Sequence, residues 1–239
     1  MLKVPLDEIY SNIGLGRFHV GLFVVCSIGF AAAAIEVVLL GFLLTELRPL
    51  WNLSEYELGM LSTVKDAGVL AGQLFWGPLA DHNGRRSTFT ITVGLVFVFG
   101  AASAFAPGFF WLTALRFLVG FGYGGCLVID LTMFTEFLPQ QHRGIMLFLF
   151  SFSWPVGQLV TIGLAWWLIP TFGWRCFVFA CSLPSLLTIF FRPLFPESPR
   201  WLSSHGRVEE ATEICRSIAI TNGKRPEDVG ILENSQVSP

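Results

Sequence analysis

Six apolar stretches dominate this sequence, and each is close to the length that a membrane-spanning helix needs. They cover residues 18–44, 58–79, 89–106, 109–134, 145–169 and 177–191, of which the last is short. About 20 mostly apolar residues form a helix long enough to cross the ~30 Å hydrocarbon layer of a bilayer. A large soluble domain with six buried helices is excluded, because the connections between the stretches are short and hold no amphipathic helices that could cover its core. The expected fold class is therefore an all-α membrane protein with six transmembrane helices.

Charged residues are scarce and unevenly placed. They make up 13% of the chain, whereas soluble domains average roughly 25%. If the six stretches alternate in direction, eleven Lys and Arg residues lie on one side, two on the other and two inside spans. Because Lys and Arg concentrate on the cytoplasmic side of membrane proteins, both termini are expected in the cytoplasm. The choice between the plasma membrane and an intracellular vesicle stays open.

Composition divides the chain into four parts. A polar N-terminal segment, 1–17, precedes the six-helix bundle, 18–191. A more polar region, 192–220, then includes an amphipathic helix whose apolar residues recur at helical spacing, namely Val208, Ala211, Ile214, Cys215 and Ile218. The last part, 221–239, has little apolar content and predicts a flexible tail.

Two kinds of local signal concern the ends and contacts of the expected helices. Gly68 and Gly72 in the second stretch, and Gly120 and Gly124 in the fourth, have the spacing that lets membrane helices approach closely. The sequence 52–54 (Asn-Leu-Ser) is an N-glycosylation acceptor motif, so Asn52 is a possible glycosylation site on the outer side. Ser54 and Glu57 alternatively form a capping box that begins the second helix.

Nothing in the chain predicts catalysis. It has no nucleophile–base set, no phosphate-binding loop and no cluster of Cys and His with metal-ligand spacing. We therefore expect no enzyme activity, no catalytic residue, no metal site and no cofactor. Nucleic acid is not an expected partner.

Four motifs, in order along the chain, resemble those of the major facilitator superfamily. Residues 77–86 read GPLADHNGRR, and 116–124 read RFLVGFGYG. Residues 136–139 (EFLP) precede Arg143 and Gly144, and 196–202 read PESPRWL, which is similar to an element of sugar porters and organic-ion carriers. Together with Asp130, six residues before Glu136, they most resemble the synaptic-vesicle-protein-related and metabolite–proton symporter branches. The resemblance covers roughly residues 13–219.

The resemblance implies one half of a transporter fold, with two three-helix inverted repeats. A complete transporter has a second six-helix half and binds its solute between the halves near the midplane. The implied function is transport of a small organic solute by alternating access, with or without proton coupling. The required partner is a second half or another copy of the chain, in addition to the lipid bilayer. The alternative is a truncated, non-transporting product that regulates or assembles with a full-length transporter.

Ionisable groups inside the spans are functional candidates, because charges in hydrocarbon are costly. Glu36 and Arg116 are expected at similar depth and, by resemblance, on helices that line the cavity; the alternative is a purely structural ion pair. Asp130 is either a proton-relay acid or part of an inner charge network. Gln158 either contacts solute or bonds a neighbouring helix. Lys65 and Asp66 are adjacent and point about 100° apart on a helix, so they are not expected to face each other.

A second set of candidates lies at the predicted cytoplasmic ends of the helices. The resemblance implies that its charged members form ion pairs that hold an inner gate closed and break as the two halves rock. The alternative is that the arginines only orient the helices in the membrane. The set comprises Gly77, Asp81, Gly84, Arg85, Arg86, Glu136, Arg143, Glu197 and Arg200.

Overall fold

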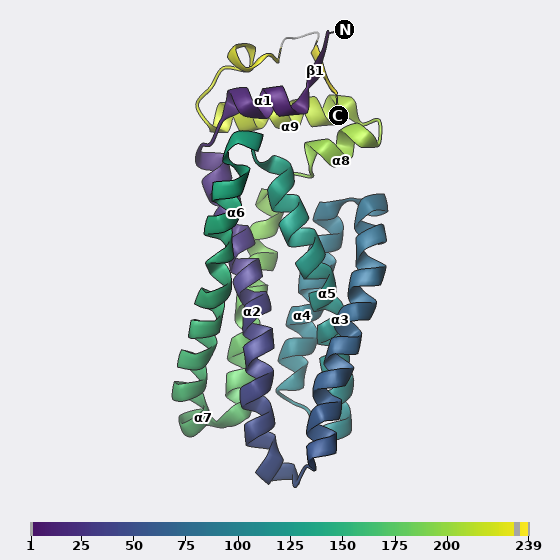
Figure 1. Cartoon of the computed structure of the whole chain (residues 1–239), viewed down its shortest axis with the longest axis vertical. Coiled ribbons are helices and arrows are strands. Elements are labelled where there is room, and N and C mark those ends of the chain that lie inside the picture. The colour runs from purple at the N-terminus through teal and green to yellow at the C-terminus, as the bar shows by residue number, and fades with distance from the viewer. Residues whose placement is uncertain (1, 232–234, 239) are drawn as a thin grey trace.

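Long antiparallel helices make up most of the molecule. The computed structural model describes residues 2–231 and 235–238. The long elements are α2 (Arg17–Trp51), α3 (Glu55–Asn83), α4 (Arg85–Ser103), α5 (Phe109–Phe137), α6 (Arg143–Ser151) and α7 (Ser153–Phe191). They stand side by side as an elongated bundle (Figure 1). Most of each expected apolar stretch lies within these elements, although residues 104–106 of the third stretch follow the end of α4, and several helices extend beyond their stretch by one or two turns.

The last long element contains two of the expected spans. Within α7 the backbone leaves helical geometry at Gly173, which has φ +80° and ψ 172°. That conformation favours glycine, and the chain reverses direction there, so that the two arms of α7 run along each other (Figure 1). With α6 extending the first arm, α2, α3, α4, α5 and the two arms of α7 form six rods, as the sequence predicts.

The rods differ in how apolar they are. Among the described residues, four continuous helical stretches are long and apolar enough to cross a membrane: 17–51, 85–103, 109–137 and the double arm 140–194. The helix α3 is not among them, because Lys65 and Asp66 lie near its middle and lower its hydropathy. It nevertheless has 29 residues and packs along α5 inside the bundle.

Glycines bring α3 and α5 into backbone contact. A Cβ atom added at Gly68 or Gly72 would lie 2.3 or 2.1 Å from the carbonyl oxygen of Phe117 or Phe121, respectively. On α5, a Cβ at Gly124 would lie 2.2 Å from the carbonyl oxygen of Val69. The close approach predicted from the glycine spacing is therefore confirmed, and only glycine fits at these contacts.

A layer of short elements covers one end of the bundle. We call this layer the capping layer and that end the capped end. The capping layer contains α1 (Leu6–Ile13), α8 (Pro199–Ser204), α9 (Val208–Thr221), and the 3₁₀ turns η1 (Gln140–His142), η2 (Arg192–Leu194) and η3 (Glu227–Val229). Strand β1 (Leu2–Pro5) pairs in parallel with β2 (Ser235–Ser238) in the same layer. The buried faces of α1 and α9 join the inner ends of α2 and α5 in one hydrophobic cluster.

Two local predictions are confirmed. Ser54 and Glu57 form the capping box at the start of α3, with both reciprocal hydrogen bonds present. The helix α9 buries Ala211, Cys215 and Ile218, as its amphipathic pattern predicts. The tail predicted to be flexible lies partly outside the described residues. Its described part carries η3 and the buried Val229 and Ile231, while its mobility stays a prediction.

Candidate functional site

Glu36 and Arg116 form an ion pair in the interior of the bundle. Glu36 on α2 accepts a hydrogen bond at Oε2 from Nη1 of Arg116 on α5, at 2.9 Å. Their side chains are 5% and 1% exposed. Nε and Nη2 of Arg116 are also buried and have no partner among the described residues. The guanidinium therefore keeps unused donors next to its single carboxylate.

Lys65 and Asp66 form a separate pair on α3. Nζ of Lys65 lies 2.8 Å from Oδ1 of Asp66, so the expectation that these neighbours would not face each other is wrong. The four-carbon lysine side chain is long enough to bend around the helix surface and reach the adjacent carboxylate. Asp66 remains 67% exposed. These four charged residues therefore neutralise one another in two pairs.

The other two cavity candidates have no ion pair within the described part of the chain. Asp130 on α5 is 3% exposed, and its Oδ1 atom has no partner among the described residues. Its other oxygen lies beside Gly29 of α2, where an added Cβ would be 3.3 Å from Oδ2. Gln158 on α7 is half-buried and makes no hydrogen bond within the described part of the chain. Asp130 is thus a buried carboxyl group with free acceptor capacity.

Sequence reasoning missed Arg192, which follows the sixth apolar stretch directly. In the structure it is 1% exposed, at the start of η2. Its guanidinium donates to Sδ of Met133 and lies 5.6 Å from the ring centroid of Phe89. Met133 is one turn from Asp130 on α5. A basic residue directly after an apolar span gives no sign of its burial in the sequence, because the residues that cover it, Met133 and Phe89, belong to other helices.

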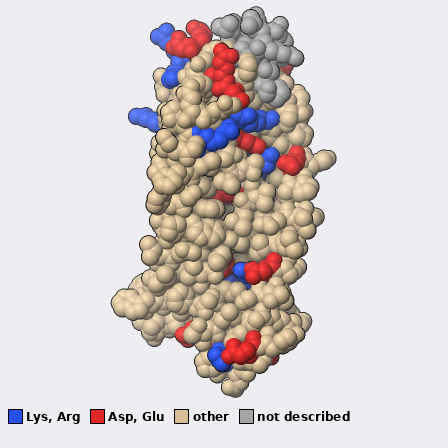
Figure 2. Space-filling model, in the orientation of Figure 1, with Lys and Arg blue, Asp and Glu red and all other residues tan. Residues whose placement is uncertain are grey.

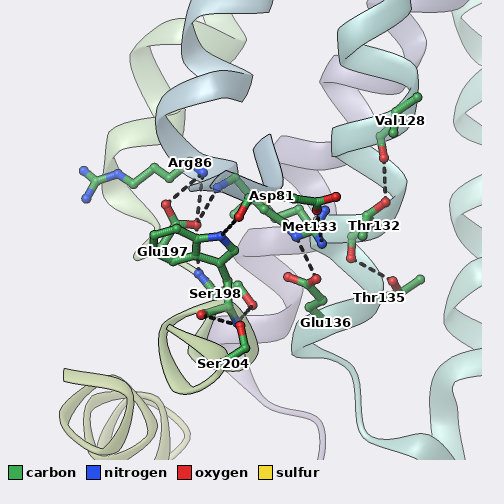
Figure 3. Close-up of polar contacts among 12 residues, drawn as sticks. Asp81, Arg86, Val128, Thr132, Met133, Thr135, Glu136, Glu197, Ser198 and Ser204 are labelled. Atoms are coloured by element: carbon green, nitrogen blue, oxygen red, sulfur yellow. Dashed lines mark hydrogen bonds and ion pairs between the residues drawn. The ribbon is translucent and has the colours of Figure 1, made fainter. Parts of the chain in front are cut away.

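Arg85 joins the ends of three helices at the capped end. Nε of Arg85, the first residue of α4, lies 2.7 Å from Oε1 of Glu136 on α5. Its Nη2 lies 3.1 Å from Oδ1 of Asp81 on α3. Asp81 and Glu136 approach this point from different helices (Figure 3). Three of the expected gate residues therefore do form an ion-pair network.

Glu197 contacts the backbone of α4, not a basic side chain. The amides of Arg85 and Arg86 donate to its carboxylate at 3.0–3.1 Å (Figure 3). These amides belong to the first turn of a helix, where unpaired N–H groups favour an anion. Gly84, with φ +101°, precedes them, and an added Cβ there would lie 2.5 Å from Oε2 of Glu197. Glycine is thus required at position 84 for two reasons: the positive φ of the backbone and the lack of space for a Cβ atom next to this carboxylate.

The remaining members of the set behave differently from one another. Arg86 donates through Nη2 to the carbonyl oxygen of Pro193 at 2.9 Å. Arg200 forms an ion pair with Asp7 of α1, a partner that the sequence did not suggest. Arg143 has no ion pair within the described residues, and Gly77 borders open space. The ion-pair expectation is therefore wrong for Arg86, Arg143 and Glu197.

Charged groups are unevenly spread over the visible surface. In Figure 2, most Lys, Arg, Asp and Glu side chains lie near the capped end, and only small groups interrupt the apolar and uncharged surface farther down. Large apolar side chains such as Phe190, Trp166 and Leu159 are exposed along the helices, at 69%, 83% and 68%. An apolar belt between two polar ends is the surface that a bilayer stabilises. The fold and the site together define a polytopic membrane protein of the transporter class.

Comparisons with known proteins give the family. The model of the sugar (and other) transporter family matches residues 16–238, so the chain belongs to that family and corresponds to the N-terminal half of a major facilitator transporter. A structure of the proton:xylose symporter XylE matches with a TM-score of 0.75 and 24% identity, over 84% of this chain and 50% of that one. The fold expected from the sequence is thereby confirmed.

Curated relatives have several names. The organic cation/carnitine transporter 7 of Arabidopsis thaliana is 39% identical over 92% of this chain and 44% of its own length. The niacin transporter NiaP of Acinetobacter baylyi is 32% identical over 96% of this chain and 51% of its own. The synaptic vesicle 2-related protein of Xenopus laevis is 33% identical over 91% and 40%, respectively. The chain spans about half the length of these relatives.

Proposed function

We propose that the chain supplies one six-helix half of a secondary transporter, which moves a small organic solute by alternating access. The observation that carries this proposal is the buried pair of Glu36 and Arg116, between α2 and α5. Buried intramembrane charges are expensive and mark solute or ion pathways. The names of the relatives support a small organic solute without choosing among carnitine, niacin and sugars.

The unused donors of Arg116 indicate how solute is bound. Nε and Nη2 have no partner among the described residues, and a guanidinium suits oxygen acceptors such as carboxylates and hydroxyl groups. Glu36 already occupies Nη1. A solute oxygen that approaches the other two donors competes with Glu36 for the positive charge, so solute binding and the state of this carboxylate are linked.

The same pair supports the proposal of proton coupling. A proton that binds Oε2 of Glu36 neutralises the carboxylate and removes the charge that holds Arg116. The freed guanidinium then binds an anionic or hydroxylated solute, and the proton and solute cross together. Asp130, deeper toward the capped end and with a free oxygen, is the next acceptor along α5 for a proton that leaves in that direction.

The network of Arg85, Asp81 and Glu136 serves as the gate at the capped end. It ties the ends of α3, α4 and α5 together while that end is closed. We place the capped end, and with it both termini, in the cytoplasm, because most Lys and Arg residues lie there. Arg86, Arg143 and Glu197 then act near the gate by backbone contact or helix orientation.

A complementary six-helix half completes the transport path, on the same polypeptide or on another chain. A bundle that lacks this half would instead occupy the partner surface of a full-length transporter and regulate it. Both forms use the same exposed apolar helix faces. They differ in whether solute moves through the assembly that contains this chain.

Uptake into proteoliposomes tests the proposal. Radiolabelled nicotinate, carnitine and xylose are offered to the chain alone and to the chain co-reconstituted with a complementary half, with and without an inward proton gradient. We expect uptake of at least one solute by the two-half form, stimulated by the gradient and abolished by Glu36→Gln. Uptake that is unaffected by Glu36→Gln would refute the role of the pair. Uptake equal to that of empty liposomes throughout would favour the regulatory alternative.

A further inference from the structure

A cavity of about 690 Å³ opens at the edge of the capped end, away from the buried ion pair. Its walls come from the first turns of α2 and α4, from the segment 193–196 and from one face of α9. No part of the proposed transport path uses it. It is therefore a candidate site for a molecule other than the solute.

Two guanidinium groups line this cavity without a carboxylate partner. Arg17 is exposed and makes no hydrogen bond or ion pair with any described residue. Among the described residues, the guanidinium of Arg86 donates only to the carbonyl oxygen of Pro193, and its side chain extends away from Glu197 (Figure 3). The acid on the wall, Glu213, is already paired with Arg216 at 3.5 Å. The cavity therefore carries uncompensated positive charge.

The rest of the lining is apolar and continues onto the outer surface of the bundle. Phe18, Phe195 and Ile214 line the cavity beside the arginines. Leu194, also in its wall, is 73% exposed. One turn earlier, at the end of α7, Phe190 and Phe191 are 69% and 45% exposed. A path of exposed apolar side chains thus leads from the cationic cavity down the part of the helices that faces hydrocarbon.

We propose that this cavity binds the headgroup of an anionic phospholipid from the leaflet next to the capped end. The phosphate oxygens accept hydrogen bonds from Arg17 and Arg86, and one acyl chain lies along Leu194 and Phe190. Basic pockets between helices at a membrane surface suit such headgroups. The proposal rests on the proposed position of the bundle in the bilayer, but not on transport activity.

The site touches both the bundle and α9. A lipid bound between Arg86 of α4 and the α9 face holds the capping layer against the first turns of two rods. Arg86 also neighbours Arg85 of the gate. Occupancy by lipid therefore stabilises the closed arrangement of the capped end.

The test measures phosphatidylglycerol binding to the delipidated full chain in detergent by native mass spectrometry. Near a membrane surface each Lys or Arg strengthens binding of anionic lipid about fivefold. We expect Arg17→Gln to weaken binding about fivefold, and Arg17→Gln combined with Arg86→Gln to weaken it about 25-fold. The matched control is Arg225→Gln, because Arg225 is also exposed and basic at the capped end but does not line the cavity. It should bind like the unchanged chain.

Three further measurements keep the result decisive. Gel filtration and thermal unfolding check that each variant is folded, and Arg17→Gln should pass because that side chain has no contact to lose. Phosphatidylcholine should bind equally to all variants. Inorganic phosphate at matched ionic strength should not displace phosphatidylglycerol. Equal weakening by Arg17→Gln and Arg225→Gln would overturn the site, and complete displacement by phosphate would assign it to a free anion and overturn the lipid.

Discussion

Arg116 of α5 holds Glu36 of α2 at 2.9 Å, and almost no part of either side chain reaches the surface of the described structure. The two residues are 80 positions apart in the sequence. Each charge is tolerated in the interior only because the other neutralises it, so removing one partner leaves an uncompensated buried charge.

The first prediction concerns this pair. Glu36→Gln and Arg116→Gln should each destabilise the protein by about 3–5 kcal/mol, and the double variant should recover much of that loss. Folded yield and thermal unfolding in detergent measure it. Losses that add in the double variant would show that the pair contributes no coupling energy.

The second prediction concerns the contact between α3 and α5. Gly72→Ala should cost about 1–3 kcal/mol, because the new Cβ meets the carbonyl oxygen of Phe121 and the helices must separate. Gly59→Ala on the same helix is the control. It faces open space and should be neutral or gain up to about 1 kcal/mol from helix propensity. Equal unfolding temperatures for the two variants would contradict the crossing.

The third prediction tests the gate in a two-half form. Arg85→Gln leaves Glu136 without its cation, so the capped end should open more often and a cysteine at Thr132, one turn along α5, should react faster with a thiol reagent. Arg207→Gln removes an exposed arginine that pairs with Glu210 at the surface, and it should not change that rate. If the rate of the thiol reaction stays the same in Arg85→Gln, Arg85 only orients the helices in the membrane and does not hold a gate.

The fourth prediction concerns orientation. Cys176 is the one exposed cysteine among the five, so Cys176→Ser gives a background of low reactivity. In intact cells an impermeant thiol reagent should label Tyr56→Cys, at the end opposite the capping layer, and should leave Asn83→Cys unlabelled. Labelling of position 83 from outside would reverse the proposed topology.

The fifth prediction concerns pH and Tyr10 of α1. Burial raises the pKa of the Tyr10 phenol well above its usual value, so the folded chain keeps this proton after the unfolded chain has lost it. Stability from this group is complete below about pH 10 and declines as the pH rises toward the folded-state pKa. Tyr10→Phe should reduce the alkaline loss.

At neutral pH, Tyr10→Phe should change stability little, because the hydroxyl group has no partner among the described residues. Thermal unfolding of both proteins at neutral and alkaline pH gives the comparison. Parallel loss in the two proteins would assign the alkaline transition to another group, such as Cys215, where burial raises the pKa of the thiol to about 12.

The helices could be predicted from the sequence because each is encoded by a continuous apolar stretch. The capping box at Ser54 and the close helix contact at Gly72 could likewise be predicted, because each depends on a short sequence pattern with one physical explanation. The sequence also predicted similar depths for Glu36 and Arg116, whereas their direct contact is known only from the structure. These features depend on residues that are near in sequence, or on the depth of a residue along its helix.

The missed features depend on side-chain reach and on folding of short segments. The pairing of Lys65 with Asp66 required a flexible side chain to bend against the direction of its Cβ. Glu197 contacts backbone amides, which have no sequence signature. Arg192 is buried against Met133 of α5 and Phe89 of α4, which are distant in the sequence. Asp7 and Arg200 are far apart in the sequence, and they pair because α1 and α8 lie together in the capping layer.

The glycine contact between α3 and α5 also has a mechanical consequence. The carbonyl oxygens of Phe117, Phe121 and Val69 lie where the methyl group of an alanine would otherwise lie on the facing helix. This close packing opposes sliding or rotation of α3 relative to α5. A movement of α3 at the end opposite the capped end is therefore expected to move α5 with it. Glu136 and Arg116 both lie on α5, so they would move together with α3 and α5 as one rigid body.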